Sequence, residues 1–336
     1  MSSEKTNPEV SVILPFYNAE NTLQAAIKSI LNQSFKNFEL LLIDNNSNDN
    51  SYEIARRLAA SDSRIILLNE TKQGVANAMN FGLQNARGRF LARMDADDIS
   101  LPTRLEKQLQ FLNKNPEIDF AGSEVKYIAH SKNTAGFRRF VARANSFHTS
   151  EEIERKRFIE IPIINPTLFF RRKLFEKYGA CLDGNFPEDY EMQLRYLEAG
   201  VKMAKLPEPL LEWHDYSTRL TRTDKRYSTK AFFKTKAAYF KKWSEKNNLF
   251  HPVIWVWGAG RKTRQRSVFL EEQGLKIKGR IDIKESKDDA LFYEDIPGPG
   301  KLFVVSMVNN TGAGENIRKF LLSKNYSEGV DFILMG

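Results

Sequence analysis

Four apolar segments separated by helical patterns are the feature that most constrains the fold of this chain. The segments are VSVIL at 10–14, FELLLID at 38–44, RIILLNE at 64–70 and RFLARMD at 89–95. Each is apolar over most of its length instead of alternating with polar residues, which is typical of strands buried on both faces. Between the first two, apolar residues recur at helical spacing, as at Leu23, Ile27 and Ile30. This alternation predicts an α/β fold with a mainly parallel, Rossmann-like sheet and helices on both faces.

Polar residues follow three of the predicted strands. Tyr17 and Asn18 follow the first strand, DNNSND starts at the end of the second, and DADD closes the fourth. The carboxyl ends of parallel strands meet at one edge of a sheet, where such folds bind their ligands. We therefore expect these three polar stretches to converge on one binding edge.

The most distinctive stretch is the acidic cluster of Asp95, Asp97 and Asp98. These carboxylates repel one another unless a positive charge lies between them. Residues at i and i+2 of an extended backbone face the same side, so Asp95 and Asp97 can share one ligand. A hard divalent cation, Mn²⁺ or Mg²⁺, bound together with a diphosphate fits this pattern. The alternative is that Asp97 and Asp98 merely cap a helix predicted at 101–113.

Three longer stretches of the chain share one known pattern. They are VSVILPFYNAENTLQAAIKSILNQSFKNFELLLIDNNSND, GRFLARMDADDISLPTRLEKQ and PEDYEMQLRYLEAG. In this order they resemble the family 2 glycosyltransferases, which have the GT-A fold. The resemblance implies an inverting, metal-dependent enzyme that moves a sugar from a nucleoside-diphosphate sugar, preferably a UDP-sugar, to a hydroxyl of a glycan or lipid-linked acceptor. It also implies a role in cell-surface polysaccharide synthesis.

The resemblance assigns the nucleotide-binding residues by position. Pro15 and Tyr17 border the nucleobase, and Asp95 lies near the ribose and the metal. Asp44 and Asn45 occupy the positions where the family usually has two acids that contact the base and ribose. Asn45 is a departure, since its amide oxygen can accept from a pyrimidine N–H but carries no charge. Asp44 and Asn45 are also common turn formers, which leaves a structural role open.

The resemblance also assigns the metal and the catalytic base. It makes Asp97 the principal metal ligand and places Asp189, in PEDYE, as the general base. It brings His214, in EWHDYS, toward the metal or diphosphate. The alternatives are that Asp189 only favours a helix N-terminus through the helix dipole and that His214 is structural.

Composition narrows the partners and the alternatives. The net charge of +9 favours acidic partners, and the single cysteine, Cys181, excludes an internal disulfide. A polar N-terminus and no long apolar run favour a cytoplasmic protein, with peripheral contact at the inner face of the membrane as a further expectation. None of the common nucleic-acid-binding motifs is present, so we expect no nucleic acid partner. A nucleotidyltransferase or a non-catalytic nucleotide-binding module is the alternative function, but LPFYNAEN lacks the Gly-rich, basic loop that a nucleotidyltransferase usually has.

The end of the chain differs from its beginning. We expect a glycosyltransferase domain at 1–224, a basic aromatic helical linker at 225–250 and a small Rossmann-like α/β domain at 251–336. The helix at 225–246 alternatively packs its aromatic face on the catalytic domain or lies on an anionic membrane surface. Gly258 and Gly260 form a nucleotide-binding-like turn, in which Thr263 occupies the position of a third glycine. The oligomeric state is left open.

Overall fold

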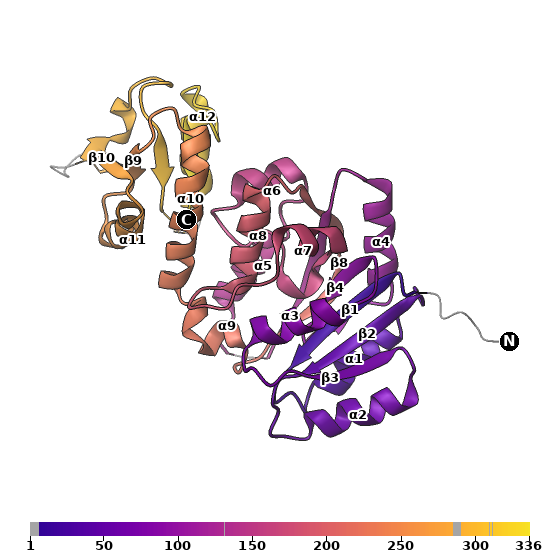
Figure 1. Cartoon of the computed structure of the whole chain (residues 1–336). Coiled ribbons are helices and arrows are strands. Elements are labelled where there is room, and N and C mark those ends of the chain that lie inside the picture. The colour runs from indigo at the N-terminus through magenta and orange to yellow at the C-terminus, as the bar shows by residue number, and fades with distance from the viewer. Residues whose placement is uncertain (1–6, 131, 285–289, 309, 311) are drawn as a thin grey trace. The chain divides into compact units, whose positions relative to one another are not determined.

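The computed structural model describes residues 7–130, 132–284, 290–308, 310 and 312–336 (Figure 1). The chain divides into two compact units. The first unit comprises Met1–Ile153, Pro162–Gly184 and Glu188–Thr223, and the second comprises Glu154–Ile161, Asn185–Pro187 and Asp224–Gly336.

The first unit is built on an eight-stranded sheet with the order β3-β2-β1-β4-β7-β6-β8-β5. Strands β1 to β4 are parallel to one another, β7 is antiparallel to β4 and β6, and β6 and β8 are parallel again. This confirms the mainly parallel α/β sheet. The strands are β1 (Val10–Phe16), β2 (Phe38–Asp44), β3 (Ile65–Asn69), β4 (Phe90–Arg93), β5 (Ile99–Ser100), β6 (Phe120–Ala129), β7 (Phe169–Arg171) and β8 (Met203–Asp215).

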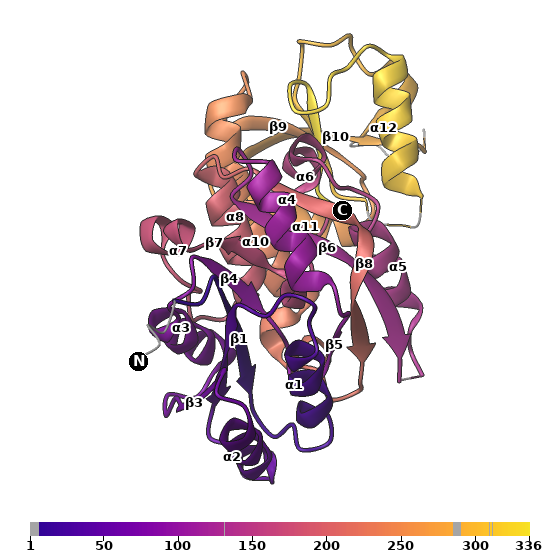
Figure 2. The ribbon, with the colours of Figure 1, turned by 90° about the vertical axis from the view of Figure 1, so that its right-hand side faces the viewer.

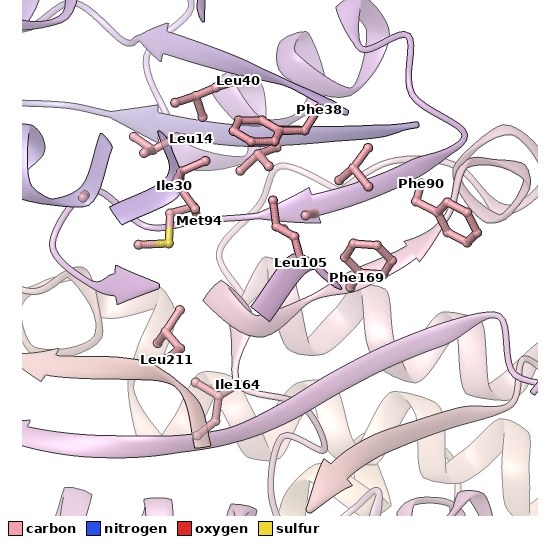
Figure 3. Packing of buried hydrophobic residues seen from close by; sticks show 14 of the residues in the cluster. Leu14, Ile30, Phe38, Leu40, Phe90, Met94, Leu105, Ile164, Phe169 and Leu211 are labelled. Carbon is pink, nitrogen blue, oxygen red and sulfur yellow. The ribbon is translucent and has the colours of Figure 1, made fainter. Parts of the chain in front are cut away.

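Helices cover both faces of this sheet because its central strands are apolar on both sides. In β1, Leu14 packs in one core with α1, and Ile13 packs in a second core with α3. Figure 2 shows α1 and α3 on opposite sides of β1. Figure 3 shows the first core, where Leu14 and Leu40 of the sheet meet Ile30 of α1. The helices are α1 (Leu23–Leu31), α2 (Ser51–Ser61), α3 (Val75–Asn85), α4 (Arg104–Lys114), α5 (Ala135–Ala144), α6 (Ser150–Lys156), α7 (Arg172–Tyr178), α8 (Glu188–Glu198) and α9 (Leu220–Thr223), with a 3₁₀ turn η1 (Asn165–Thr167).

Two strands that the sequence pattern did not predict help to shape the binding edge. Strand β5 pairs antiparallel with β8, joining Ser100 to Leu211. This pairing brings the end of the acidic stretch beside the segment that carries His214. It also corrects the start of the next helix, which was expected near 101 and begins at Arg104, because residues 99 and 100 are extended.

The second unit contains a smaller parallel sheet with the order β11-β10-β9-β12-β13. This is the Rossmann-like arrangement expected from 251 onward. Its elements are η2 (Lys225–Tyr227), α10 (Thr229–Asn247), β9 (Val253–Trp257), α11 (Arg261–Glu272), β10 (Lys276–Asp282), β11 (Ala290–Phe292), η3 (Tyr293–Asp295), β12 (Val304–Ser306), α12 (Ala313–Ser323) and β13 (Phe332–Leu334).

Helix α10 belongs to this second unit. The rings of Phe240 and Trp243 lie 5.7 and 6.3 Å from the ring of Phe158, and both also contact Phe303. The helix therefore packs its aromatic face on Phe303 and on Phe158, which lies within the range expected for the catalytic domain but belongs to the second unit, so α10 is not a separate linker. Among the described residues, no helix is long and apolar enough to cross a membrane.

Candidate active site

The carboxyl ends of β1 and β2 lie next to each other, as the alternation predicts. Pro15 is partly buried near the end of β1, and the Tyr17 side chain that follows is 49% exposed. Asp44 ends β2 in register with Phe16 and is buried. One of its carboxylate oxygens accepts a hydrogen bond of 3.3 Å from the backbone N–H of Ser47. An exposed aromatic ring and a buried carboxylate thus occupy neighbouring strand ends.

Asn45 uses its amide group within the protein. The amide nitrogen donates to the carbonyl oxygens of Glu70 and Lys72 at 2.9 and 3.0 Å. The amide oxygen accepts from the backbone N–H of Gly74 at 2.7 Å. These bonds fix the loop that follows β3. The structure thus directs the Asn45 amide at the loop, where the sequence interpretation had it facing a base.

The acidic cluster has the donor set that a divalent cation requires. One oxygen from each of Asp95, Asp97 and Asp98 lies within 4.8 Å of the others. Asp98 is fully buried, and its Oδ2 has no hydrogen-bond partner in the described part of the chain. Carboxylate oxygens that converge in this way suit Mn²⁺ or Mg²⁺. The residues present therefore fit the metal that the resemblance implies.

Arg219 supplies a positive charge inside this cluster. Its Nη1 donates to Asp98 Oδ1 at 2.9 Å and lies 3.5 Å from Asp97 Oδ2, while Nη2 lies 3.5 Å from Asp95 Oδ2. The guanidinium carbon lies 4.4 Å from the centre of the Trp213 ring, a cation–π contact. Burial lowers the pKa of Arg219, but the three carboxylates outweigh burial and raise it.

Sequence reasoning did not identify Arg219. The only signal was indirect: three neighbouring acids require a positive partner, and a buried arginine can provide it. The sequence offers many arginines, and Arg219 is separated from Asp98 by 121 positions.

Burial raises the pKa of Asp97, and the charge of Arg219 opposes that rise.

Arg93 connects the acidic cluster to the start of α8. Its Nε donates to Asp95 Oδ1 at 2.9 Å. Burial lowers the pKa of Arg93, but the charges of Asp95 and Glu188 outweigh burial and raise it. Arg93 therefore interacts electrostatically with carboxylates from the segment after β4 and from α8, which brings DADD and PEDYE into one electrostatic environment.

Asp189 lies in the first turn of α8 and is buried. Burial and the neighbouring charge of Glu188 raise the pKa of Asp189 to about 7, while the charge of Arg93 opposes the rise. Asp95 adds a smaller effect in the same direction as Glu188. A carboxylate whose pKa lies near neutrality can accept a proton at physiological pH and later release it.

His214 approaches the cluster through its backbone. The His214 N–H donates to Asp98 Oδ1 at 2.8 Å. The ring lies elsewhere, with Nδ1 3.1 Å from His130 Nε2 and 3.4 Å from the Tyr216 hydroxyl. Burial lowers the pKa of the His214 ring. The group of side chains that could share a metal, searched over the described residues, does not include His214.

Comparisons with known proteins agree on one family. The sequence profile of glycosyl transferase family 2 matches residues 11–179. The putative glycosyltransferase EpsE of Bacillus subtilis (strain 168) is 32% identical over 228 residues, which cover 66% of this chain and 79% of EpsE. The UDP-Glc:alpha-D-GlcNAc-diphosphoundecaprenol beta-1,3-glucosyltransferase WfgD of Escherichia coli is 48% identical over 107 residues, which cover 32% of this chain and 42% of WfgD.

Two solved structures share the fold at low sequence identity. S. aureus TarS 1-349, in complex with UDP-GlcNAc, superposes with a TM-score of 0.57 at 15% identity, over 79% of this chain and 71% of that one. The mannosyltransferase PcManGT from Pyrobaculum calidifontis, in complex with GDP-Man and Mn²⁺, superposes with a TM-score of 0.52 at 17% identity, over 81% and 70%. These similarities concern the fold alone.

Proposed function

Since this chain belongs to glycosyl transferase family 2 and is a glycosyltransferase, we propose that it transfers a sugar from a nucleoside-diphosphate sugar to a hydroxyl group with inversion. The proposed donor is a UDP-sugar, and the proposed acceptor is a glycan or a lipid-linked sugar of cell-surface polysaccharide synthesis. The named activity of WfgD, which pairs UDP-Glc with a diphosphoundecaprenol-linked acceptor, supports both choices. The net charge of +9 suits an acceptor that is met at an anionic membrane surface.

The observation that carries this proposal is the buried carboxylate of Asp189 beside Arg93. With a pKa of about 7, Asp189 takes the proton from the acceptor hydroxyl as that oxygen attacks the anomeric carbon. The new C–O bond forms as the bond to the diphosphate breaks, and the diphosphate leaves with the bonding electrons. A single displacement of this kind inverts the anomeric configuration.

The donor would be held by the strand ends of the first unit. We assign Pro15, Tyr17 and Asp44 to the nucleotide, and Asn45 to the support of the loop after β3. Asp97 and Asp95 would hold Mn²⁺ or Mg²⁺, with Asp98 beside them. When bound, the metal acts as a Lewis acid that neutralises charge on the departing diphosphate. His214 would act through its backbone bond to Asp98.

We place the catalytic domain within 1–224 and assign 225–336 to the second domain, together with residues 154–161 and 185–187, which belong to the same compact unit as α10. All the proposed catalytic residues lie in the first of these domains. The second domain then serves docking or assembly instead of sugar transfer.

The test is a donor panel. The full chain is incubated with UDP- and GDP-sugars, a short-chain α-GlcNAc-diphosphate lipid and Mn²⁺, Mg²⁺ or EDTA. Release of nucleoside diphosphate and the mass of the acceptor are measured. We expect one donor to add one sugar in a metal-dependent reaction, with an inverted anomeric centre by NMR. A folded protein that releases diphosphate from none of the donors would contradict the proposal.

A further inference from the structure

Arg219 lies against the three carboxylates that could hold a metal. Its guanidinium is buried, with 7% of the side chain exposed, and it lies within 3.5 Å of all three carboxylates of the acidic cluster. The shortest contact, at 2.9 Å, is to Asp98. The contacts to Asp95 and Asp97 are longer, at 3.5 Å, and Asp95 is also held by Arg93 Nε at 2.9 Å.

The position of Arg219 is fixed by groups other than the acids. Its Nη1 also donates to the backbone carbonyl of His214 at 2.5 Å, and its guanidinium lies on the Trp213 ring. Both contacts come from the end of β8, which pairs with β5 directly after the acidic stretch. Arg219 is therefore built into the site instead of reaching into it from solvent.

The charges of the site indicate what this arrangement does. Asp95, Asp97 and Asp98 offer three negative charges, and the buried arginines Arg93, Arg104 and Arg219 all act on them with positive charge, so the cluster is largely neutralised before any metal binds. A divalent cation alone would add two positive charges to this buried site, where the energy of unbalanced charge is large. A diphosphate that arrives with the metal brings negative charge that offsets them.

We propose that Arg219 couples metal binding to nucleotide binding: it weakens the affinity of the acidic cluster for Mn²⁺ until a nucleoside diphosphate is bound. Arg219 is thus a positioning residue: it pairs with the carboxylates and competes with a metal ion that arrives without a diphosphate. The site therefore prefers the metal and the diphosphate together. Such coupling is reciprocal, so the metal raises the affinity for the nucleotide by the same factor. The inference rests on the metal site of the proposed function, and it is tested without turnover.

The experiment is a Mn²⁺ titration of the nucleotide-free full-length chain, with free Mn²⁺ measured by electron paramagnetic resonance. Arg219→Gln removes the competing charge, and we expect it to bind Mn²⁺ at least about tenfold more tightly than the wild type. Arg219→Lys keeps the charge and should stay within about threefold. Arg222→Gln is the matched control, since Arg222 pairs with Asp215, outside the acidic cluster.

A gain in metal affinity in an Arg219→Gln variant that keeps the thermal unfolding of the wild type separates this role from a structural one. Repeating the titration with UDP or GDP should show tighter Mn²⁺ binding in the wild type and a smaller difference in Arg219→Gln. Equal or weaker Mn²⁺ binding by Arg219→Gln would overturn the proposal. If that variant does not fold, the Mn²⁺ affinity of the wild type tests the proposal. Equal affinity with and without UDP or GDP would contradict coupling. Sugar transfer without any Mn²⁺ binding would refute the coupling and leave the transferase function intact.

Discussion

The two units of this chain place parallel strand ends at a sheet edge, but they use those ends differently. In the first unit, Asp95, Asp97 and Asp98 crowd together around Arg219. In the second unit, a strand-end acid of the same unit accepts a hydrogen bond from the turn after β9: the backbone N–H of Ala259 donates to Asp282 Oδ2 at 2.8 Å. The acid that ends β10 thus bonds to the glycine turn.

This difference shows that a Rossmann-like topology supplies an edge and not an activity. At the first edge, one oxygen from each of three carboxylates converges within 4.8 Å, which favours a charged ligand. The second edge pairs its acid with its own turn. The predictions below test this contrast, from the largest expected effect on catalysis to the smallest.

The largest effect is expected at the base. Asp189→Asn keeps the shape of the side chain but cannot accept the proton of the acceptor. We expect kcat to fall by about 10²- to 10⁴-fold, with donor affinity within a few-fold of wild type. Steady-state release of nucleoside diphosphate and equilibrium binding of UDP or GDP measure the two quantities.

Glu191→Gln is the matched control for this variant. Glu191 pairs with Arg195 at 3.0 Å, and Arg195 also donates to the carbonyl oxygen of Ala180 at 2.6 Å. The control should therefore lower stability by about 1–3 kcal/mol and leave kcat nearly unchanged. Normal transfer by Asp189→Asn together with an inactive Glu191→Gln or Glu188→Gln would show that the base is misassigned.

The pH dependence of the wild type checks the same residue. Because the pKa of Asp189 is raised to about 7, the carboxylate becomes protonated, and inactive as a base, when the pH falls below that value. We expect kcat/KM to decrease about tenfold per pH unit below about 7 and to level off above it, as the free enzyme titrates. A flat profile between pH 5.5 and 8 would exclude this titration.

The second effect compares the two edges directly. Asp97→Ala should abolish the Mn²⁺-dependent rise in Tm that UDP or GDP produces, a stabilisation of about 2.7 kcal/mol when the ligand is at a hundred times its Kd. Asp282→Ala removes the strand-end acid of the second unit and should leave that rise unchanged, although the protein loses about 1–2 kcal/mol of stability. Loss of the nucleotide effect in Asp282→Ala but not in Asp97→Ala would reverse the assignment of the edges.

A smaller effect is expected where this chain departs from its family. Asn45→Asp introduces the usual acid, whose oxygens would face the carbonyl oxygens of Glu70 and Lys72. The loop after β3 should loosen, which raises the donor KM by roughly tenfold, an effect of about 1.4 kcal/mol, with little change in kcat. Asn48→Asp adds the same charge in the same segment and should have a smaller effect. If Asn45→Asp instead lowers the donor KM, Asn45 faces the nucleotide.

The elements that could be predicted from the sequence are those specified by local pattern. The strands up to β4 and the helices between them follow from apolar runs and helical spacing, and the strand-end acids follow from that alternation. Strand β8 was missed because Pro207 and Pro209 interrupt it and its pairing partner β6 is distant in sequence. Arg219 was missed for the same reason, since its contacts to Asp95 and Asp98 span 124 and 121 positions.

The smallest effect on catalysis is expected in the glycine turn of the second unit. Gly258 has a φ of +108°, and a Cβ there would lie 2.8 Å from Thr263 Oγ1 and 2.9 Å from Val308 Cγ2. Gly258→Ala should therefore cost about 1–3 kcal/mol of stability, because the strained backbone and the contact with Thr263 act together. At Gly260 a Cβ would meet no atom within 4 Å, so Gly260→Ala is the matched control with little expected loss.

Thermal unfolding measures the stability of both variants, and diphosphate release below the unfolding transition measures catalysis. The rate of release should stay within twofold of wild type in both variants, since the catalytic residues lie in the first unit. If folded Gly258→Ala loses nucleotide binding, the second edge takes part in donor recognition and the contrast between the two edges fails.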